Sequence, residues 1–320
     1  MRRTIHDQIA ANGRLSVVYS LLVMLVLTGL GASIVGYYAP QYWIGGAAGC
    51  AVLGIIVALV AWNTGGEIVL RINQARDATP HELQVVNNVV EEMAIAAGIP
   101  KPEVYVIDDP APNAFATGKG PKKGIVCVTT GLLAMLNRDE LQGVVGHEVG
   151  HIRNNDIRFM TTLAIVVGLI PLISHFFLRS LWYGGGGRRR SDSDSGGQAA
   201  LIFAALAIVL AILAPICTRL LELAVSRRRE FMADASSAQF TRNPGALADA
   251  LRKISSHPQK MQTANRATAH MFFVNPFKPV QKIASLFSTH PPVEDRIAAL
   301  MGLNGMDYHR YLPADDQDAL

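Results

Sequence analysis

The chain has 320 residues, of which half are apolar and only 17% are charged. Soluble domains carry roughly 25% charged residues, so the composition disfavours an ordinary soluble protein and favours one with membrane segments. The formal net charge of +4 is modest and no face is rich in both aromatic and basic residues, so we expect no nucleic-acid partner. The three cysteines have no pairing or metal-ligand spacing, and we interpret them as reduced packing residues.

Two uncharged apolar segments open the chain, at residues 16–37 and 44–62. Each is close to the roughly 20 residues that cross a hydrocarbon core. Tyrosines and a tryptophan lie in the break between them, as at a membrane interface. A signal peptide is the alternative for the first segment because arginines precede it, but the segment is long for one and a second follows at once. We predict an N-terminal membrane hairpin over residues 1–62.

Residues 63–159 predict the first part of a polar domain that mixes helices and strands. Thr79 is a suitable N-cap for a helix that Gly98 ends. Residues 103–108 alternate as in a strand, and residues 113–130 indicate two strands around a Gly/Pro/Lys turn.

The next predicted helix begins with a capping box at Asn137 and carries the motif H-E-V-G-H. Residues four apart differ by about 40° around a helix, so His147 and His151 lie on one face and can offer two imidazole nitrogens to one metal ion. Glu148 lies about 60° further round, beside such an ion, where it could take a proton from an activated water. A chance match is the alternative, and the capped helix and the acids further along the chain count against it.

Two more apolar segments, 161–178 and 199–218, flank a Gly/Arg/Ser-rich linker and predict a second membrane hairpin over residues 160–218. Both contain a proline, which lipid tolerates when neighbours satisfy the backbone. With the N-terminus inside, the arginine-rich linker falls outside, contrary to the positive-inside rule. The hairpin therefore either spans despite this charge or enters the bilayer without crossing it.

Residues 219–320 are polar again and complete the predicted domain. In them Glu230 and Asp234 lie four apart on a predicted helix, and further helix starts are predicted at Asn243 and His290. Catalytic zinc usually takes three protein ligands, so Glu230 would be the third, and Asp234 could accept a hydrogen bond from a ligand imidazole. The alternative is a pair of acids on a solvated face beside three arginines. Next to the H-E-V-G-H motif we favour the ligand.

Four motifs follow one another along nearly the whole chain, namely P-N-A-F-A-T-G, H-E-V-G-H, S-R-R-R-E-F-M-A-D and T-H-P-P-V-E-D-R-I. With the two apolar hairpins they resemble the HtpX family of membrane zinc metalloproteases, bacterial relatives of the type I CAAX prenyl proteases within the gluzincin clan. The resemblance implies an α+β, mainly α-helical, gluzincin-type zinc metalloprotease domain with two membrane hairpins, hence four transmembrane helices. The linker at 184–198 looks longer than the family needs, and the acidic tail after Tyr311 matches nothing in it.

The resemblance further implies one Zn2+ per chain, held by His147, His151 and Glu230, with Glu148 as the general base. It implies a multi-pass endopeptidase of the cell inner membrane, active in stress responses, whose catalytic domain faces the cytoplasm. The expected partners are the lipid bilayer and misfolded or damaged membrane-protein substrates, with self-cleavage as a further hypothesis. The alternatives are a CAAX-type prenyl-protein peptidase, which needs a cavity for a lipidated C-terminus, and a non-catalytic zinc-containing membrane scaffold, which usually has four zinc ligands.

Other candidate residues rest mostly on the resemblance. If Asn113 and Ala114 lie on a sheet edge, the backbone could pair with an extended substrate and the Asn113 side chain could hold a substrate carbonyl; otherwise Asn113 only flanks a turn. His290 and Arg296 frame a helix start, where a hydrogen-bond donor near the zinc would stabilise an oxyanion; otherwise they are a helix cap and a surface arginine. We interpret Asp156 as a residue that ends or supports the helix, although it could reach back toward the metal ligands.

Overall fold

The computed structural model describes residues 21, 24–162, 164–165, 175, 179, 201–209, 212, 229–265, 267–277 and 291–303. The chain forms two compact units. Unit 1 comprises Met1–Arg14, Asn63–Thr162 and Glu222–Leu320, and unit 2 comprises Leu15–Trp62 and Leu163–Leu221. Unit 1 therefore holds every candidate site residue named from the sequence.

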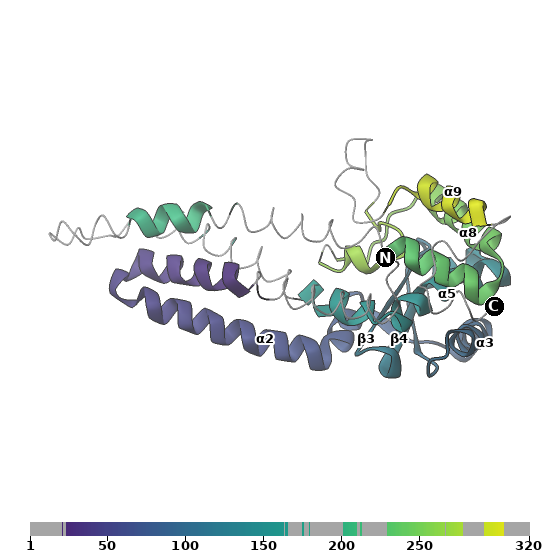
Figure 1. Ribbon diagram of the computed structural model, residues 1–320, viewed down its shortest axis with the longest axis horizontal. Coiled ribbons are helices and arrows are strands. Elements are labelled where there is room, and N and C mark those ends of the chain that lie inside the picture. The colour runs from purple at the N-terminus through teal and green to yellow at the C-terminus, as the bar shows by residue number, and fades with distance from the viewer. Residues whose placement is uncertain are drawn as a thin grey trace, which may run out of the picture. The chain divides into compact units, whose positions relative to one another are not determined.

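Unit 2 contains apolar helices. The short turn η1 (Pro40–Tyr42) leads into α2 (Trp43–Ile72), and the stretch Pro40–Ile72 is the one helix among the described residues that is long and apolar enough to cross a membrane (Figure 1). Met24–Tyr38 is a shorter apolar helix. The predicted spans at 161–178 and 199–218 lie largely outside the described residues, apart from the helical stretch 201–209.

The second apolar segment of the sequence ends at Trp62, where the first part of unit 2 also ends, and the helix α2 continues beyond it to Ile72. Its last turns belong to unit 1, where Val69 and Leu70 are buried. There, a Cβ added to Gly66 would lie 3.2 Å from the Cα of Gly118, so the helix packs tightly against the backbone. The continuation follows from this packing, which hydropathy cannot reveal.

Unit 1 is built on a four-stranded sheet in the order β1-β2-β4-β3. The strands β2 and β4 run parallel, and the β1–β2 and β3–β4 pairs are antiparallel. The predicted two strands around a turn are β3 and β4, which the turn η2 connects. Neither the short β1 nor the parallel pairing was predicted. The strands are β1 (Ala75–Asp77), β2 (Glu103–Ile107), β3 (Ala114–Gly118) and β4 (Gly124–Thr129), and η2 is Pro121–Lys123.

The helices of unit 1 begin where the capping residues predicted. Thr79 caps α3 and Asn137 caps α5, each in a complete capping box, and α3 ends at Gly98, whose φ of 68° favours glycine. The predicted start at Asn243 is confirmed as the N-cap of α8. The helices are α3 (Pro80–Ala97), α4 (Thr130–Met135), α5 (Arg138–Arg153), α8 (Pro244–Ser256) and α9 (Val293–Leu303), with the turn η3 at Ala269–Met271.

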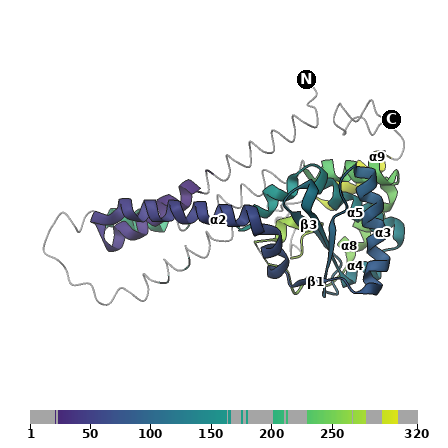
Figure 2. The same cartoon turned by 90° about the horizontal axis from the view of Figure 1, so that it is seen from below.

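The core of unit 1 lies between one face of the sheet and the helices α3, α5 and α8 (Figures 1 and 2). Alternate residues of the strands point into it, because side chains of a strand alternate between faces. The strand residues of this core are Val106, Ala114, Ala116, Val126 and Val128. The motif helix α5 is therefore a buried central helix, with twelve buried residues, and its two histidines lie inside the unit.

Candidate metal centre

The two histidines of the H-E-V-G-H motif face each other inside unit 1. His147 and His151 are 1% and 3% exposed, and their Nε2 atoms lie 3.2 Å apart. Both come from α5, where a spacing of four residues brings side chains onto one face. The helix thus presents two imidazole nitrogens to the same point.

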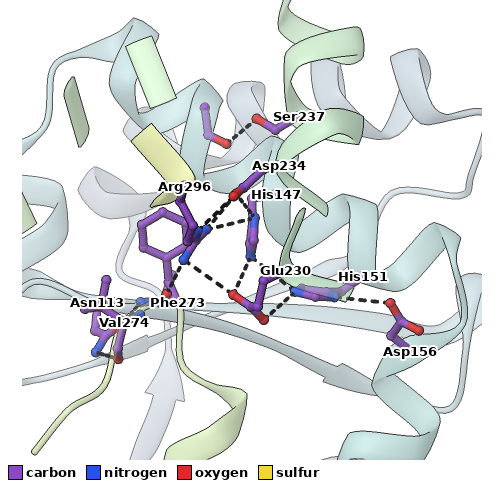
Figure 3. A network of polar contacts seen from close by, with 12 residues as sticks. Asn113, His147, His151, Asp156, Glu230, Asp234, Ser237, Phe273, Val274 and Arg296 are labelled. Carbon is purple, nitrogen blue, oxygen red and sulfur yellow. Dashed lines mark hydrogen bonds and ion pairs between the residues drawn. The ribbon is translucent and has the colours of Figure 1, made fainter. Parts of the chain in front are cut away.

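A third donor comes from the helical residues 229–241. Glu230 Oε2 lies 3.7 Å from His147 Nε2, and Glu230 Oε1 lies 3.5 Å from His151 Nε2 (Figure 3). One ligand atom from each of the three residues lies within 4.8 Å of the others, a group that could hold a metal ion. The three residues that the sequence predicted as ligands are therefore brought together.

Glycines on α5 let the two helices approach this closely. A Cβ on Gly150 would lie 3.0 Å from Ser236 Cβ, and one on Gly146 would lie 3.0 Å from Ser237 Oγ. The Ser237 hydroxyl also donates to the Gly143 carbonyl at 2.6 Å. Because these glycines have no Cβ, the helix that carries Glu230 can pack directly against the helix that carries the two histidines.

A carboxylate holds each histidine from behind. His147 Nδ1 lies 2.8 Å from Asp234 Oδ1, and His151 Nδ1 lies 3.3 Å from Asp156 Oδ2. An ionised carboxylate only accepts hydrogen bonds, so each Nδ1 donates its proton and each Nε2 is the nitrogen left to bind a metal ion. Contacts of this kind fix the tautomer and orientation of metal-binding imidazoles. Both contacts follow the sequence hypotheses for Asp234 and Asp156.

Arg296 of α9 links the supporting carboxylate to the ligands. Its Nε and Nη2 donate to the two oxygens of Asp234 at 2.8 and 2.6 Å, and its Nη1 lies 3.4 Å from Glu230 Oε2. The side chain is 1% exposed. Arg296 and His147 outweigh the effect of burial and hold the pKa of Asp234 below its ordinary value. Arg296 is thus a buried part of the centre, and the alternative of a surface arginine is wrong.

The donor set fits a zinc ion. Two imidazole Nε2 atoms and a carboxylate point at one another, and a positive charge among them, from a proton or a metal ion, stabilises the group. Burial disfavours a charged His151, but Asp156 and Glu230 outweigh it and raise the pKa of His151 to about 10. Burial, helped by Arg296, lowers the pKa of His147 to about 4 despite Asp234. Two histidines and one carboxylate are a common ligand set of catalytic zinc.

Glu148 lies beside this group and is 1% exposed. Neither of its carboxylate oxygens has a hydrogen-bond partner among the described residues. Burial, together with Glu230, raises the pKa of Glu148 to about 8, and His151, Arg296 and the nearby Ala116 amide oppose the rise. Burying an unpartnered carboxylate costs free energy, so stability does not explain its position. The role predicted from the sequence, proton transfer beside a metal ion, stays a prediction.

The predicted substrate residues lie at the outer edge of the sheet, on and beside β3. Asn113 is 1% exposed, and its side chain pairs with the backbone of Val274 (Figure 3). Ala114 follows it as the first residue of β3, and its carbonyl accepts from the Phe273 amide at 2.8 Å. Their role toward a substrate stays a prediction. His290 lies outside the described residues.

Sequence reasoning missed two contributors to the centre. Arg229 Nε lies 3.6 Å from Asp156 Oδ1, and the Phe273 ring meets His147 edge-on, with ring centroids 5.0 Å apart. Arg229 directly precedes Glu230 in the S-R-R-R-E-F-M-A-D motif, and this position is the sequence feature that could have indicated its role. The Phe-Phe-Val run at 272–274 indicates only an apolar segment, and nothing local ties it to the histidines.

The comparisons with known proteins agree with this geometry. The model of peptidase family M48 matches residues 80–304. The chain belongs to this family. It is 46% identical over 305 residues to a protease HtpX homologue of Caldanaerobacter subterraneus subsp. tengcongensis and 44% identical over 305 residues to one of Thermoanaerobacter pseudethanolicus. Each alignment covers 94% of this chain and 99% of the relative.

Membership of family M48 makes the chain a metalloprotease, and among the relatives it groups with the HtpX homologues, as its motifs predicted. The crystal structure of S. mikatae Ste24p is similar over 92% of this chain and 66% of that chain, with 20% sequence identity and a TM-score of 0.46. That likeness is too distant to inform the substrate.

Proposed function

We propose that this M48 chain is a zinc endopeptidase of the cell inner membrane that hydrolyses misfolded or damaged membrane proteins on the cytosolic side. The observation that carries the proposal is the group of His147, His151 and Glu230, with Glu148 buried and unpartnered beside it. The M48 relationship supports peptide hydrolysis, and the long apolar helix α2 supports a membrane location. The substrate class rests on the resemblance to the HtpX family.

In this proposal His147, His151 and Glu230 hold one zinc ion per chain. A bound zinc ion would supply Lewis-acid activation of water and of the substrate carbonyl. Asp234 and Asp156 orient the two imidazoles through their Nδ1 protons. Arg296 approaches Glu230 and pairs with Asp234, and it helps to hold the pKa of Asp234 below its ordinary value.

Glu148 is the proton carrier in the proposal. Its carboxylate accepts the proton of the attacking water and passes it to the leaving amine nitrogen. Its raised pKa of about 8 results mainly from burial, and a nearby positive charge lowers the pKa of a carboxyl group. The same carboxylate can then be ionised before attack and protonated afterwards, as both halves of the reaction require.

An extended substrate would bind along the outer edge of β3. In this strand order β3 has a neighbour on one side only, and edge strands offer free peptide groups to an added strand. Asn113 and Ala114 would bind the substrate backbone there. Arg296, with His290, would donate to the developing oxyanion.

Two hairpins would anchor this domain in the membrane as four transmembrane helices. Residues 1–62 and 160–218 form the hairpins in the proposal, and residues 63–159 and 219–320 form the catalytic domain in the cytoplasm. The helices Met24–Tyr38 and Pro40–Ile72 support the first hairpin. Membrane proteins and the chain itself are the proposed substrates.

The test compares full-length wild type with Glu148→Gln, both purified in detergent and loaded with zinc. The substrate is a model membrane protein in a stable form and in a destabilised form. We expect wild type to cut the destabilised form faster, and Glu148→Gln to keep its zinc while losing at least about 100-fold in rate. The matched control is Glu91→Gln, which changes an exposed glutamate paired with Lys101. Equal rates for Glu148→Gln and wild type would rule out this mechanism.

A further inference from the structure

The outer edge of β3 is the surface that the proposed function assigns to an extended substrate. The Asn113 carbonyl accepts from the Thr129 amide on the β4 side. Peptide groups of consecutive residues turn to opposite sides of a strand, so Ala114 and Ala116 direct theirs to the outer side. The Ala116 amide opposes the rise of the Glu148 pKa, and β3 packs against α5, the helix that carries Glu148. This edge therefore runs past the general base.

Residues 271–277, which we call the strap, occupy half of this edge. Phe272 and Phe115 form an antiparallel bridge, with ring centroids 5.1 Å apart. The Phe273 amide donates to the Ala114 carbonyl at 2.8 Å. The strap thus lies as an added strand along the first residues of β3.

The Asn113 side chain completes the pairing in both directions. Its Oδ1 accepts from the Val274 amide at 3.2 Å, and its Nδ2 donates to the Val274 carbonyl at 2.9 Å. These are backbone groups that any peptide possesses. The residue predicted to hold a substrate instead holds a residue of its own chain.

Phe273 connects the strap to the metal centre. Its carbonyl accepts from Arg296 Nη1 at 3.0 Å, its ring meets the His147 ring edge-on, and the guanidinium of Arg296 lies 4.8 Å from the ring centroid. The same arginine holds Asp234 behind His147. The strap therefore contacts both the outer edge of β3 and the side chains of Arg296 and His147 (Figure 3).

We propose that the strap is an intrachain occupant of the peptide-binding edge, which an extended substrate has to displace before it is cut. This inference rests on the proposed function. All four hydrogen bonds of Phe273 and Val274 to Ala114, Asn113 and Arg296 use backbone groups of the strap. A substrate of any sequence can replace them, whereas the Phe273 ring is the part that only a bulky apolar residue replaces.

The first test is hydrogen exchange on full-length Glu148→Gln protein, which should bind peptide without cutting it. The probe is a synthetic peptide with the sequence of residues 271–276 of the strap, Met-Phe-Phe-Val-Asn-Pro, and its binding is first measured by fluorescence anisotropy. We expect the amides of Phe273 and Val274 to exchange faster when the peptide is bound. If the peptide binds and their exchange is unchanged or slower, the strap is a fixed part of the fold and the proposal is overturned.

The second test is kinetic and uses an internally quenched form of the same peptide. A docked strap lowers the fraction of chains that can bind the peptide, so the apparent dissociation constant equals the intrinsic one divided by that fraction. For Phe272→Ala, which removes the ring packed on Phe115, we expect KM to fall by up to about tenfold, with kcat nearly unchanged. The matched control Phe277→Ala removes an aromatic ring of the strap that lies beyond these edge contacts. A loss of kcat in Phe272→Ala with KM unchanged or raised would overturn the proposal.

A third variant provides the test if Phe272→Ala does not fold. Cysteines at the bridged pair Phe115 and Phe272 would lock the strap by a disulfide, in a Cys127→Ala background because Cys127 pairs with Phe115 in β4. We expect peptide hydrolysis to be lost on oxidation and restored by a reductant, and each single-cysteine protein to ignore both treatments. Hydrolysis by the oxidised double variant at the reduced rate would overturn the proposal.

These tests separate the strap from the proposed function. If the wild-type protein cuts neither the membrane protein nor the peptide, the proposed function is refuted. If wild type cuts the substrate and the oxidised disulfide variant cuts it as well, only the proposal about the strap is refuted.

Discussion

Two clusters of charged side chains lie in unit 1, and they differ in what surrounds them. The buried cluster contains Arg296, Asp234 and Glu230, whose side chains are 1%, 3% and 4% exposed. The surface cluster contains Arg76, Glu82 and Asp108, whose side chains are 34%, 15% and 66% exposed. Both are built from one arginine and two carboxylates, so the comparison isolates the effect of burial.

The surface cluster organises the start of a helix. Glu82 closes the capping box of α3 with Thr79, and Arg76 of β1 donates to Glu82 and to Asp108. The hydrogen bonds from Arg76, together with the Thr79 amide, lower the pKa of Glu82 to about 2. Exposed pairs of this kind contribute about 1 kcal/mol or less, and this cluster touches no metal ligand.

The buried cluster cannot be explained by stability in the same way. Desolvation of buried charges offsets most of their attraction, so a well-packed apolar set is often as stable. Its members instead support His147 and lie within reach of the ligand atoms. The comparison teaches that one arginine with two carboxylates can cap a helix at the surface, whereas the same residue types in the core surround the candidate metal ligands.

Removal of each arginine gives the largest difference between the clusters. Arg296→Met removes the guanidinium that contacts the buried Asp234 and Glu230, so we expect a loss of about 3–5 kcal/mol in unfolding free energy and loss of peptide hydrolysis. Arg76→Met should cost about 1 kcal/mol or less and leave hydrolysis unchanged. Thermal unfolding and peptide assays measure both. A similar loss of stability in the two variants would break the comparison.

Removal of one supporting carboxylate tests the buried cluster alone. Asp234→Asn should weaken zinc binding by about 10–100-fold, because it disturbs the proton and orientation of His147. Asp156→Asn should have the smaller effect, because its contact to His151 is 3.3 Å rather than 2.8 Å. Competition with a fluorescent zinc chelator gives both affinities. The reverse order would show that His151 depends more on its support than these distances indicate.

A glycine substitution tests whether the buried cluster depends on close helix approach. Gly150→Ala places a Cβ 3.0 Å from Ser236 Cβ, which forces the helices apart at a cost of about 1–3 kcal/mol and should weaken zinc binding several-fold. Gly302→Ala on α9 is the control, since a Cβ there meets nothing within 4 Å. Zinc affinity and melting temperature are the measurements. Unchanged zinc affinity in Gly150→Ala would show that the glycines are dispensable.

The smallest expected effect is the pH dependence of the surface cluster. Because the pKa of Glu82 is lowered in the folded state to about 2 from 4.5, its contribution to stability is present above about pH 4.5 and disappears as the pH falls toward 2. The stability difference between wild type and Glu82→Gln should follow the same course. Denaturant unfolding at several pH values measures it. A difference that stays constant down to pH 2 would contradict the role of this ion pair.

Local sequence signals predicted much of the fold and of the candidate centre. Capping residues such as Thr79 and Asn137 set the helix starts, because they satisfy backbone groups within a few residues. The spacing of His147 and His151 predicted a shared face because helical periodicity is local. By contrast, the parallel pairing of β2 with β4 and the short β1 depend on partners far along the chain.

The sequence by itself determined the residue types of the centre and the helices that carry them. Only the tertiary structure decided which side chains meet. It placed Arg296 on Asp234, brought Glu230 to the histidines through the space left at Gly146 and Gly150, and laid Phe273 along β3. The physical reason is that caps and periodicity act over a few residues, whereas these contacts join residues 62 to 159 positions apart, which only the packing of the whole unit brings together.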